Sequence, residues 1–355
     1  MPHDEWRVAM VVPLRGPAGL FAPSCEAVIE LAVDEVNAHG GILGREVVAE
    51  IVDGGDRPDQ VAADVRRRVD AGAVHAVSGW HISSVREALV PVLAGRVPYA
   101  YPSLYEGGES RRGVFCSGET PEVQIAPALR WMRDELGVRR WFVVGDDYVW
   151  PHLSARAVRG FAHELDLDIV GEAFVALGAM DVERLVDRVE RAPCDGVLML
   201  LVGQDAVDVN REFARRGLDD RLVRFSPLME ENMLLASGAD ATGNLFVASS
   251  YFRSMATAGA LDLLGGYLRK HGPEAPALSS AAESCYEGLH TLAAIAHRAA
   301  TDRLEAWDAA VDGTAYEGPR GTVEFRGRQA RQPVHLAVAD GVDFDVLTAL
   351  PAVAP

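Results

Sequence analysis

Apolar runs of strand length alternate with amphipathic runs of helix length through most of this sequence. The first run, 8–12, is apolar throughout, and the run after it repeats apolar residues at helical spacing behind a proline in its first turn. A strand–helix–strand rhythm of this kind predicts a parallel sheet with helices on both faces. In this first part of the chain the predicted strands are 8–12, 47–52 and 74–77, and the predicted helices are 23–38, 58–71 and 83–93.

The same rhythm starts again after Pro121, and a length of 355 residues allows about two domains. We therefore predict an α/β fold with two doubly wound parallel-sheet units in tandem, at about 1–120 and 121–250. Long helices and a hairpin-like tail are predicted after them. In the second unit the helices are 125–136, 155–165, 182–191 and 206–216, and the strands are 141–144, 168–171, 196–201 and 223–226. In the last hundred residues the helices are 256–271, 281–298 and 304–311, and the hairpin strands are 322–326 and 334–339.

The charge of the chain narrows its possible partners. It has 34 basic and 52 acidic residues, a net charge of −18, and Lys270 is its single lysine. Phosphate backbones and anionic lipid heads would repel such a chain, so we expect no direct binding of nucleic acid. No apolar run approaches the roughly 18 residues of a membrane span, so we expect no membrane insertion.

Motifs for cofactor or metal chemistry are absent from the sequence. There is no Gly-x-Gly-x-x-Gly after a strand, no phosphate-binding loop with a lysine, no Gly-x-Ser-x-Gly and no His-Glu-x-x-His. We therefore predict no cofactor, no metal and no catalytic residue, although an α/β enzyme acting on a small polar metabolite stays open as an alternative. The four cysteines are far apart, which fits ordinary thiols rather than a disulfide framework or a zinc site. They are Cys25, Cys116, Cys194 and Cys285.

Polar and aromatic residues follow several predicted strands, and ligands of open α/β sheets bind beyond the carboxyl ends of strands. Ser83 stands where a helix begins, so its neighbouring N–H groups would hold a carbonyl or carboxylate oxygen. Each residue alone is more often a helix cap or loop contact, but the recurrence favours a small polar ligand. The candidate ligand-binding residues are Trp80, His81, Ser83, Tyr101, Ser103, Leu104, Tyr148, Trp150, Gly203, Asp205 and Glu230.

Several segments together resemble the type I periplasmic-binding-protein family, in its branched-chain amino acid receptor group. A closer likeness is to the amide-sensing regulator of amidase operons and to urea and short-chain amide receptors. The broad resemblance rests on 11–18, on 36–45, on Gly79 with Ser83, and on 118–121; the closer one rests on 101–107, on 145–151 and on Tyr251 with Phe252.

The resemblance implies a clamshell of two lobes joined by three crossovers, with a ligand cleft between them. The lobes would be 1–120 plus 252–328 and 121–251 plus 329–355. In it Ser83, Tyr101, Ser103 and Tyr148 would contact the ligand, and His81 and Leu104 would line the pocket. We expect Ser83 and Ser103 to donate to a ligand oxygen, Tyr148 to cover the ligand from the other lobe, and Glu230 or Asp205 to accept from a ligand nitrogen.

The expected function is non-enzymatic binding of an amide, urea or amino acid with hinge closure. The chain would serve as a solute-binding protein or an amide sensor, or alternatively as a branched-chain amino acid receptor of an ABC transporter. Its protein partner would be a transporter permease or an antitermination regulator. We expect a cytoplasmic location if the chain is complete, and an extracytoplasmic one if a leader was removed.

Overall fold

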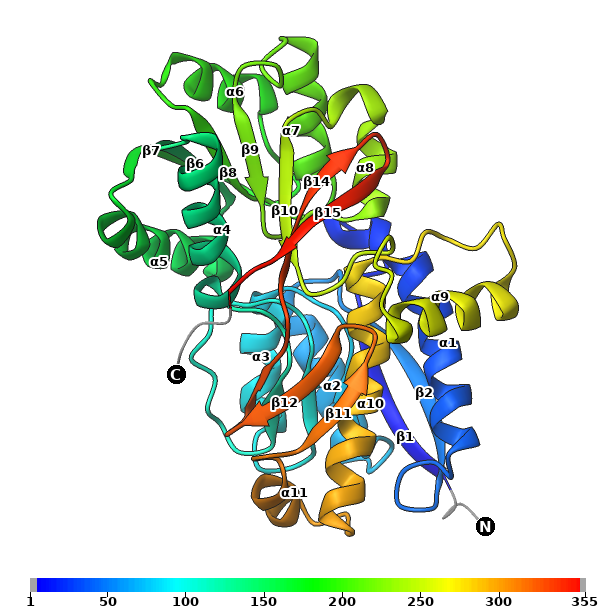
Figure 1. Ribbon diagram of the computed structural model, residues 1–355. Coiled ribbons are helices and arrows are strands. Elements are labelled where there is room, and N and C mark those ends of the chain that lie inside the picture. The colour runs from blue at the N-terminus through cyan, green and yellow to red at the C-terminus, as the bar shows by residue number, and fades with distance from the viewer. Residues whose placement is uncertain (1–4, 352–355) are drawn as a thin grey trace. The chain divides into compact units, whose positions relative to one another are not determined.

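The computed structural model describes residues 5–351, and this part of the chain forms two compact units (Figure 1). Unit 1 takes in the chain up to Gly118 together with Ala256–Gln332. Unit 2 takes in Glu119–Met255 together with the chain from Pro333 onward. Each unit is therefore assembled from two separate pieces of sequence, and the chain passes between the units three times.

Unit 1 is built on an eight-stranded sheet of order β11-β12-β13-β5-β4-β3-β1-β2. Strands β1 to β5 pair in parallel, β13 joins the edge of β5 in parallel, and β12 and β11 continue the sheet antiparallel. The strands are β1 Glu5–Val12, β2 Glu46–Asp53, β3 Ala76–Ser78, β4 Tyr99–Tyr101, β5 Val114–Cys116, β11 Ala315–Gly318, β12 Gly321–Arg326 and β13 Gln329–Arg331.

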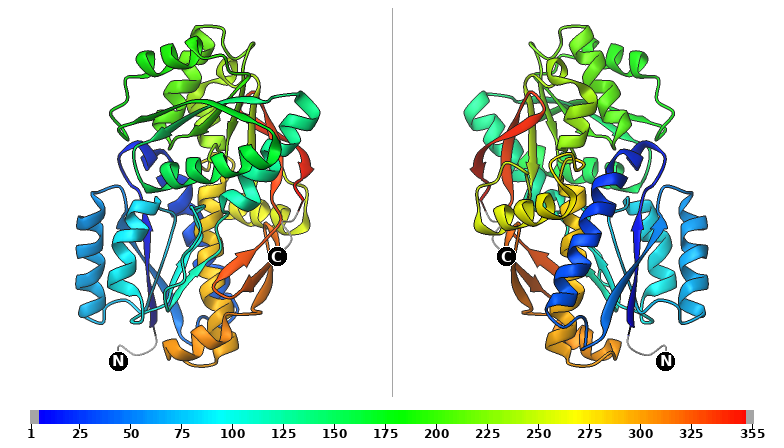
Figure 2. Two further views of the ribbon diagram at one scale, coloured as in Figure 1. Left: turned by 90° about the vertical axis from the view of Figure 1, so that its left-hand side faces the viewer. Right: turned by 90° about the vertical axis from the view of Figure 1, so that its right-hand side faces the viewer.

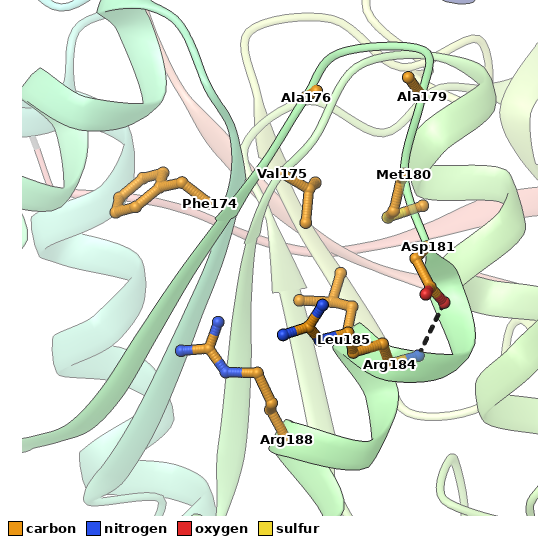
Figure 3. A pocket seen from close by; sticks show the side chains of 9 residues that line it. All are labelled: Phe174, Val175, Ala176, Ala179, Met180, Asp181, Arg184, Leu185 and Arg188. Carbon is orange, nitrogen blue, oxygen red and sulfur yellow. Dashed lines mark hydrogen bonds between the residues drawn. The ribbon is translucent and has the colours of Figure 1, made fainter.

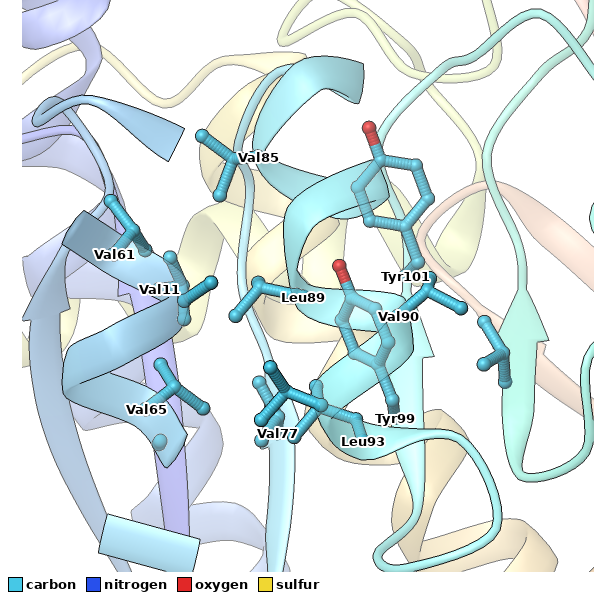
Figure 4. Packing of buried hydrophobic residues seen from close by; sticks show 14 of the residues in the cluster. Val11, Val61, Val65, Val77, Val85, Leu89, Val90, Leu93, Tyr99 and Tyr101 are labelled. Carbon is cyan, nitrogen blue, oxygen red and sulfur yellow. The ribbon is translucent and has the colours of Figure 1, made fainter. Parts of the chain in front are cut away.

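Helices cover both faces of this sheet. Alternate strand residues point to opposite faces, and both sets are buried against helices. Val11 and Val77 pack in one buried cluster with Leu89 of α3 (Figure 4). On the other face Ser78 lies beneath α10, so close that a Cβ on Gly288 would stand 2.1 Å from its Oγ. Figure 2 shows α2 and α3 on one side of the sheet and α1 and α10 on the other. The helices of unit 1 are η1 Pro17–Phe21, α1 Ala22–Ala38, α2 Pro58–Asp70, α3 Ser83–Leu93, α9 Ala258–His271, α10 Ser280–Ala299 and α11 Leu304–Ala310.

Unit 2 is built on a seven-stranded sheet of order β15-β14-β10-β9-β8-β6-β7, in which β6 to β10 pair in parallel. Its strands are β6 Arg140–Asp146, β7 Asp168–Val175, β8 Gly196–Leu200, β9 Val223–Ser226, β10 Leu245–Ser249, β14 His335–Asp340 and β15 Asp343–Ala349. Its helices are α4 Pro121–Leu136, α5 Val149–Leu165, α6 Val182–Arg191, α7 Gln204–Arg215, α8 Glu231–Ser237 and η2 Ala239–Ala241. Two parallel-dominated sheets with flanking helices confirm the predicted fold class.

The predicted hairpin at the end of the chain is wrong. Residues 322–326 lie in β12, which pairs with β11 and β13 in unit 1, whereas 334–339 lie largely in β14, which pairs with β10 and β15 in unit 2. Each segment pairs with an antiparallel neighbour across a short turn, at 318–321 and 340–343. The sequence pattern shows 322–326 and 334–339 but not the strands beside them. It therefore predicts that these two segments pair with each other.

The unit boundaries also differ from those that the resemblance implied. Residues 329–332 were expected in the second lobe, but β13 pairs with β5 and places them in unit 1. Side chains fix this position: Gln332 Nε2 donates to Ser117 O at 2.7 Å, and Gln329 Nε2 donates to Gly118 O at 3.0 Å. Within unit 2, Glu119 Oε1 accepts from Ser250 N at 2.8 Å.

The four cysteines are free and buried. Cys285 Sγ accepts from the backbone N–H of Trp80 at 3.3 Å. In the described range 5–351, no helix has both the length and the apolar character that a membrane crossing requires. The single lysine joins two helices of unit 1, because Lys270 Nζ on α9 pairs with the Asp34 carboxylate on α1.

A buried ion cluster holds α3 against the segment that follows β4. Arg86 pairs with Glu106 and Glu109, and the side chains of all three are at most 4% exposed. The same guanidinium lies 5.7 Å from the ring centre of Tyr101 and 5.3 Å from that of Tyr105. Removing one member of such a cluster leaves uncompensated charge in the interior, so it costs far more free energy than the intact pair contributes.

We predict that Arg86→Ala lowers the free energy of unfolding by about 3–5 kcal/mol, because the Glu106 carboxylate stays buried without its cation, while Glu109 keeps its pair with Arg111. Arg57→Ala is the matched control, since the Arg57–Asp59 pair is largely exposed and such pairs contribute about 0–1 kcal/mol. Urea unfolding of both variants measures the difference. Equal midpoints for Arg86→Ala and Arg57→Ala would contradict the assigned role of the cluster.

Candidate functional site

The first turn of α3 has free hydrogen-bonding groups at the carboxyl edge of the unit 1 sheet. The helix begins at Ser83, and its first internal bonds run from Val85 N and Arg86 N to Ile82 O. Within residues 5–351 the N–H groups of Ser83 and Ser84 therefore have no backbone acceptor. A helix start of this kind attracts anions and carbonyl oxygens.

Ser83 Oγ adds a second donor at this position. The residue is 2% exposed, and among the described residues its hydroxyl makes no hydrogen bond of regular geometry. Burial raises the pKa of Tyr101, and the nearby Arg86 and Ser83 hydroxyl oppose that rise, so Ser83 Oγ does approach the phenol. The interaction with Tyr101 is weak by geometry, which leaves the buried Ser83 hydroxyl available to another partner.

His81 holds the segment before α3 in place through hydrogen bonds of its ring. Its Nδ1 lies 3.1 Å from Val11 O, and its Nε2 lies 2.6 Å from the Tyr99 hydroxyl. A carbonyl can only accept, so Nδ1 carries the proton and Nε2 accepts from Tyr99. Burial lowers the pKa of His81 to about 4, which keeps the ring neutral. Both ring nitrogens are thus bonded inside unit 1, unlike the pocket-lining role expected for His81.

Tyr101 and Ser103 hold the backbone of His81 in place. The Tyr101 hydroxyl donates to His81 O at 2.9 Å, and Ser103 Oγ accepts from His81 N at 3.2 Å. Both residues are at most 1% exposed. The Tyr101 proton is used in this bond, whereas the Ser103 hydroxyl accepts and still has its own proton to donate.

The two remaining unit 1 candidates are apolar. Trp80 is 3% exposed and packs edge-on against Phe21, with ring centres 4.8 Å apart. Leu104 is half-buried. Trp80 and Leu104 are therefore better suited to form an apolar wall of a ligand site than to make a polar contact with a ligand.

The unit 2 candidates follow the carboxyl ends of β6, β8 and β9. Tyr148 precedes α5 in an extended conformation. The centre of its ring lies 6.2 Å from that of Trp150, whose side chain is buried. Gly203 precedes α7 with a positive φ of 55°, a backbone region that favours glycine. The unit 2 sheet therefore gathers these residues at one edge, as parallel strands require.

Asp205 shares a buried pair of carboxyl groups with Asp146. Asp146 Oδ2 accepts from Val202 N at 2.8 Å, and Asp205 Oδ2 accepts from Gly178 N at 2.7 Å. Burial, and then the charge of Asp205, raises the pKa of Asp146 to about 9. Asp146 is thus protonated at neutral pH, and burial also raises the pKa of Asp205. The strand predicted at 141–144 stopped short of Asp146, which in the structure is the last residue of the buried strand β6.

Glu230 and Glu231 stand together at the start of α8. Glu230 is 2% exposed and precedes the helix, and Glu231 is 1% exposed. Glu231 Oε1 accepts from Arg253 N at 2.8 Å, and burial raises the pKa of Glu231 to about 7. Sequence analysis missed Glu231, although two adjacent glutamates just after a buried strand are an unusual pattern.

The donor set does not favour a metal centre. Among residues 5–351 no group of three or more histidine, cysteine, aspartate or glutamate side chains has metal-binding geometry. Unit 1 offers donors and unit 2 offers acceptors, each at the carboxyl edge of its own sheet. Donors and acceptors of these kinds can bind the polar groups of a small molecule.

The family profile of periplasmic binding proteins matches residues 5–342. The Leu/Ile/Val-binding protein BraC3 of Rhizobium johnstonii is 32% identical over 203 residues, which cover 56% of this chain and 54% of that protein. The Leu/Ile/Val-binding protein homolog 8 of Brucella abortus is 38% identical over 89 residues, 24% of this chain and 22% of that protein. The matched segments thus span about half the length of these curated relatives or less.

Solved structures resemble the whole chain. A solute-binding protein of an ABC transporter from Rhodopseudomonas palustris, in complex with benzoate, superposes with a TM-score of 0.87 at 16% identity, covering 99% of this chain and 98% of that one. The branched-chain amino acid transporter substrate-binding protein LivJ of Streptococcus pneumoniae, in complex with isoleucine, gives 0.83 at 19% identity, covering 98% and 99%. At these identities the likeness establishes the fold. The profile match, which covers most of the chain, shows that this chain belongs to the periplasmic binding protein family.

Proposed function

We propose that this chain binds a small carboxylate-bearing solute, an amino acid in the first place, between units 1 and 2 and releases it unchanged. The unbonded Ser83 hydroxyl beside the free N–H groups of α3 carries this proposal. Buried polar groups without partners cost about 1–3 kcal/mol each, and a carboxylate at this position satisfies them. Members of the family bind solutes without chemistry, which supports a binding role over the α/β enzyme alternative.

The solutes of related proteins support a carboxylate. Isoleucine, benzoate and 3,4-dihydroxybenzoate, each bound to a protein of this fold, share that one group. None of the relatives named above is an amide or urea receptor, so the amide specificity expected from the closer resemblance has no support from them. In unit 2, Glu230 rather than Asp205 is the acceptor for a solute ammonium, because Asp205 already accepts from Gly178 N and burial favours its uncharged form.

A two-unit receptor of this kind works by a shift between open and closed forms. In this proposal the solute first binds at the α3 start, and Tyr148 and Glu230 then close on it, so the bound solute favours the closed form. Because the family and the transporter proteins of like fold are solute receptors, we propose an extracytoplasmic location and an ABC-transporter permease as partner. A cytoplasmic sensor acting on an antitermination regulator has no such support.

Ser83→Ala should weaken solute binding by about 5- to 150-fold, since the carboxylate loses a buried donor worth about 1–3 kcal/mol. Calorimetric titration with L-leucine, L-isoleucine, L-valine, benzoate, acetamide and urea identifies the solute and then compares the variants. Ser154→Ala is the matched control, because Ser154 is also a fully buried serine whose Oγ has no partner among the described residues. Binding of acetamide or urea alone, or equal affinities for both variants, would contradict the proposal.

Glu230→Gln separates an amino acid from a plain carboxylate. Wild-type protein should prefer L-leucine over 4-methylpentanoate, the same molecule without its amino group. The charged contact to Glu230 is worth about 1.5–3 kcal/mol, or roughly 10- to 150-fold. In Glu230→Gln this preference should disappear, while affinity for 4-methylpentanoate stays within about threefold. A preference that survives the substitution would place the ammonium elsewhere.

Asp146→Asn tests the protonated pair. Burial raises the pKa of Asp146 to about 9, so the folded protein keeps a proton that the unfolded chain releases near pH 4. Rising pH between these two values therefore opposes folding. Asp146→Asn should keep its solute affinity and should gain thermal stability relative to wild type as the pH is raised from 5 to 8. A stability difference that does not change over this range would mean that Asp146 is ionised in the folded protein.

A further inference from the structure

A second pocket lies within unit 2, away from the residues discussed so far. The end of β7, the loop that follows it and the first two turns of α6 enclose about 430 Å³ (Figure 3). Val175, Met180 and Leu185 supply apolar walls, and Arg184 and Arg188 supply positive charge. All its lining residues belong to unit 2, so the pocket exists without any contribution from unit 1.

The two arginines stand one turn apart on the same side of α6. Figure 3 shows both guanidinium groups on the side of the helix that faces β7. Arg188 Nη2 donates to the backbone oxygen of Glu172 at 2.7 Å, and the Arg184 guanidinium makes no hydrogen bond in the described part of the chain. Like charges at this spacing repel each other weakly, and an anion bound between them would relieve that repulsion.

Nearby carboxylates are already paired with other arginines. Glu172 pairs with Arg159 at 2.9 Å, and Asp187 pairs with Arg216 at 2.7 Å and with Arg191 at 3.2 Å. The pocket therefore stays positive in a chain whose net charge is −18.

The one carboxylate that lines the pocket, as far as the described residues extend, is Asp181, and it caps α6. Its Oδ1 accepts from Arg184 N at 3.1 Å, so it fills the helix start. The free anion-binding groups of the pocket are therefore the guanidinium groups of Arg184 and Arg188.

We infer that this pocket is a second binding site, for a small organic carboxylate with an aromatic or short aliphatic body. Guanidinium groups bind carboxylates through paired hydrogen bonds, which suits two arginines that face one space. The apolar walls of Val175, Met180 and Leu185 take the body of the molecule. The volume suffices for a molecule of benzoate size. The site is independent of the solute site proposed at α3.

The test is a titration of ¹⁵N-labelled protein with 4-fluorobenzoate, followed through backbone amide shifts at constant ionic strength. In wild-type protein we expect saturable shifts at residues 174–188. In the double variant Arg184→Gln with Arg188→Gln the affinity read from these amides should fall at least about tenfold. Arg191→Gln is the matched control, because Arg191 lies on the same helix and pairs with Asp187 outside the pocket. It should bind like wild type.

Two further arms fix the chemistry and the independence of the site. Sodium sulfate should shift these amides far more weakly, because it lacks an apolar body. Ser83→Ala should leave the shifts at 174–188 intact, so that failure of the α3 site and failure of this site are distinguishable. The inference is overturned if wild-type protein shows no saturable shifts there, if the double variant binds as wild type does, or if sulfate binds equally well. All these arginines are exposed, so we expect each variant to fold. Circular dichroism is the check that it does.

Discussion

The close approach of the chain at Gly79 to the end of β1 is the contact on which the unit 1 surface depends. Gly79 has a φ of +113°, and a Cβ there would stand 2.4 Å from Val11 O. Only glycine lets the segment after β3 pass so near β1. That passage brings the His81 ring onto Val11 O and sets where α3 begins at the edge of the sheet. The position of the donors proposed for a solute, which are the first N–H groups of α3 and the Ser83 hydroxyl, thus depends on one backbone constraint.

The alternation of runs predicted the two sheets and their helices because parallel strands between helices are buried and apolar. It did not predict β4, β5 and β13, which are only three residues long, or the longer strands β10, β11 and β15. The position of Ser83 followed from a strand–helix junction, which is local in sequence. The roles of His81 and Asp146 did not, since their partners Val11 and Val202 lie 70 and 56 residues away. Burial set by distant chain decides whether such a group is charged, bonded or exposed.

Charge in this protein is distributed in two ways. Inside unit 1 it is tightly paired: Arg320 and Glu283, both fully buried, join a strand connection to α10, much as Arg86 joins α3 to its neighbours. Replacing a buried ion pair with apolar residues often leaves the stability unchanged. We therefore attribute to these pairs a role in favouring one packing arrangement of the helices over others. Along the surface, many arginines pair with the more abundant carboxylates. Arg184 and Arg188 are among the exposed arginines that form no ion pair within residues 5–351, and these two line a pocket.

The Lys270–Asp34 contact between α9 and α1 has a consequence for chemical labelling. With one lysine in the chain, amine-reactive reagents have a single side-chain target, and it lies in unit 1. Acylation of Lys270 removes its charge and breaks the contact with Asp34, so the label also loosens the α9–α1 junction. Amine cross-linkers report only what comes near this one position. Mapping a partner against the rest of the surface therefore requires carboxyl-directed reagents, because this acidic chain has many aspartate and glutamate side chains that can react with them.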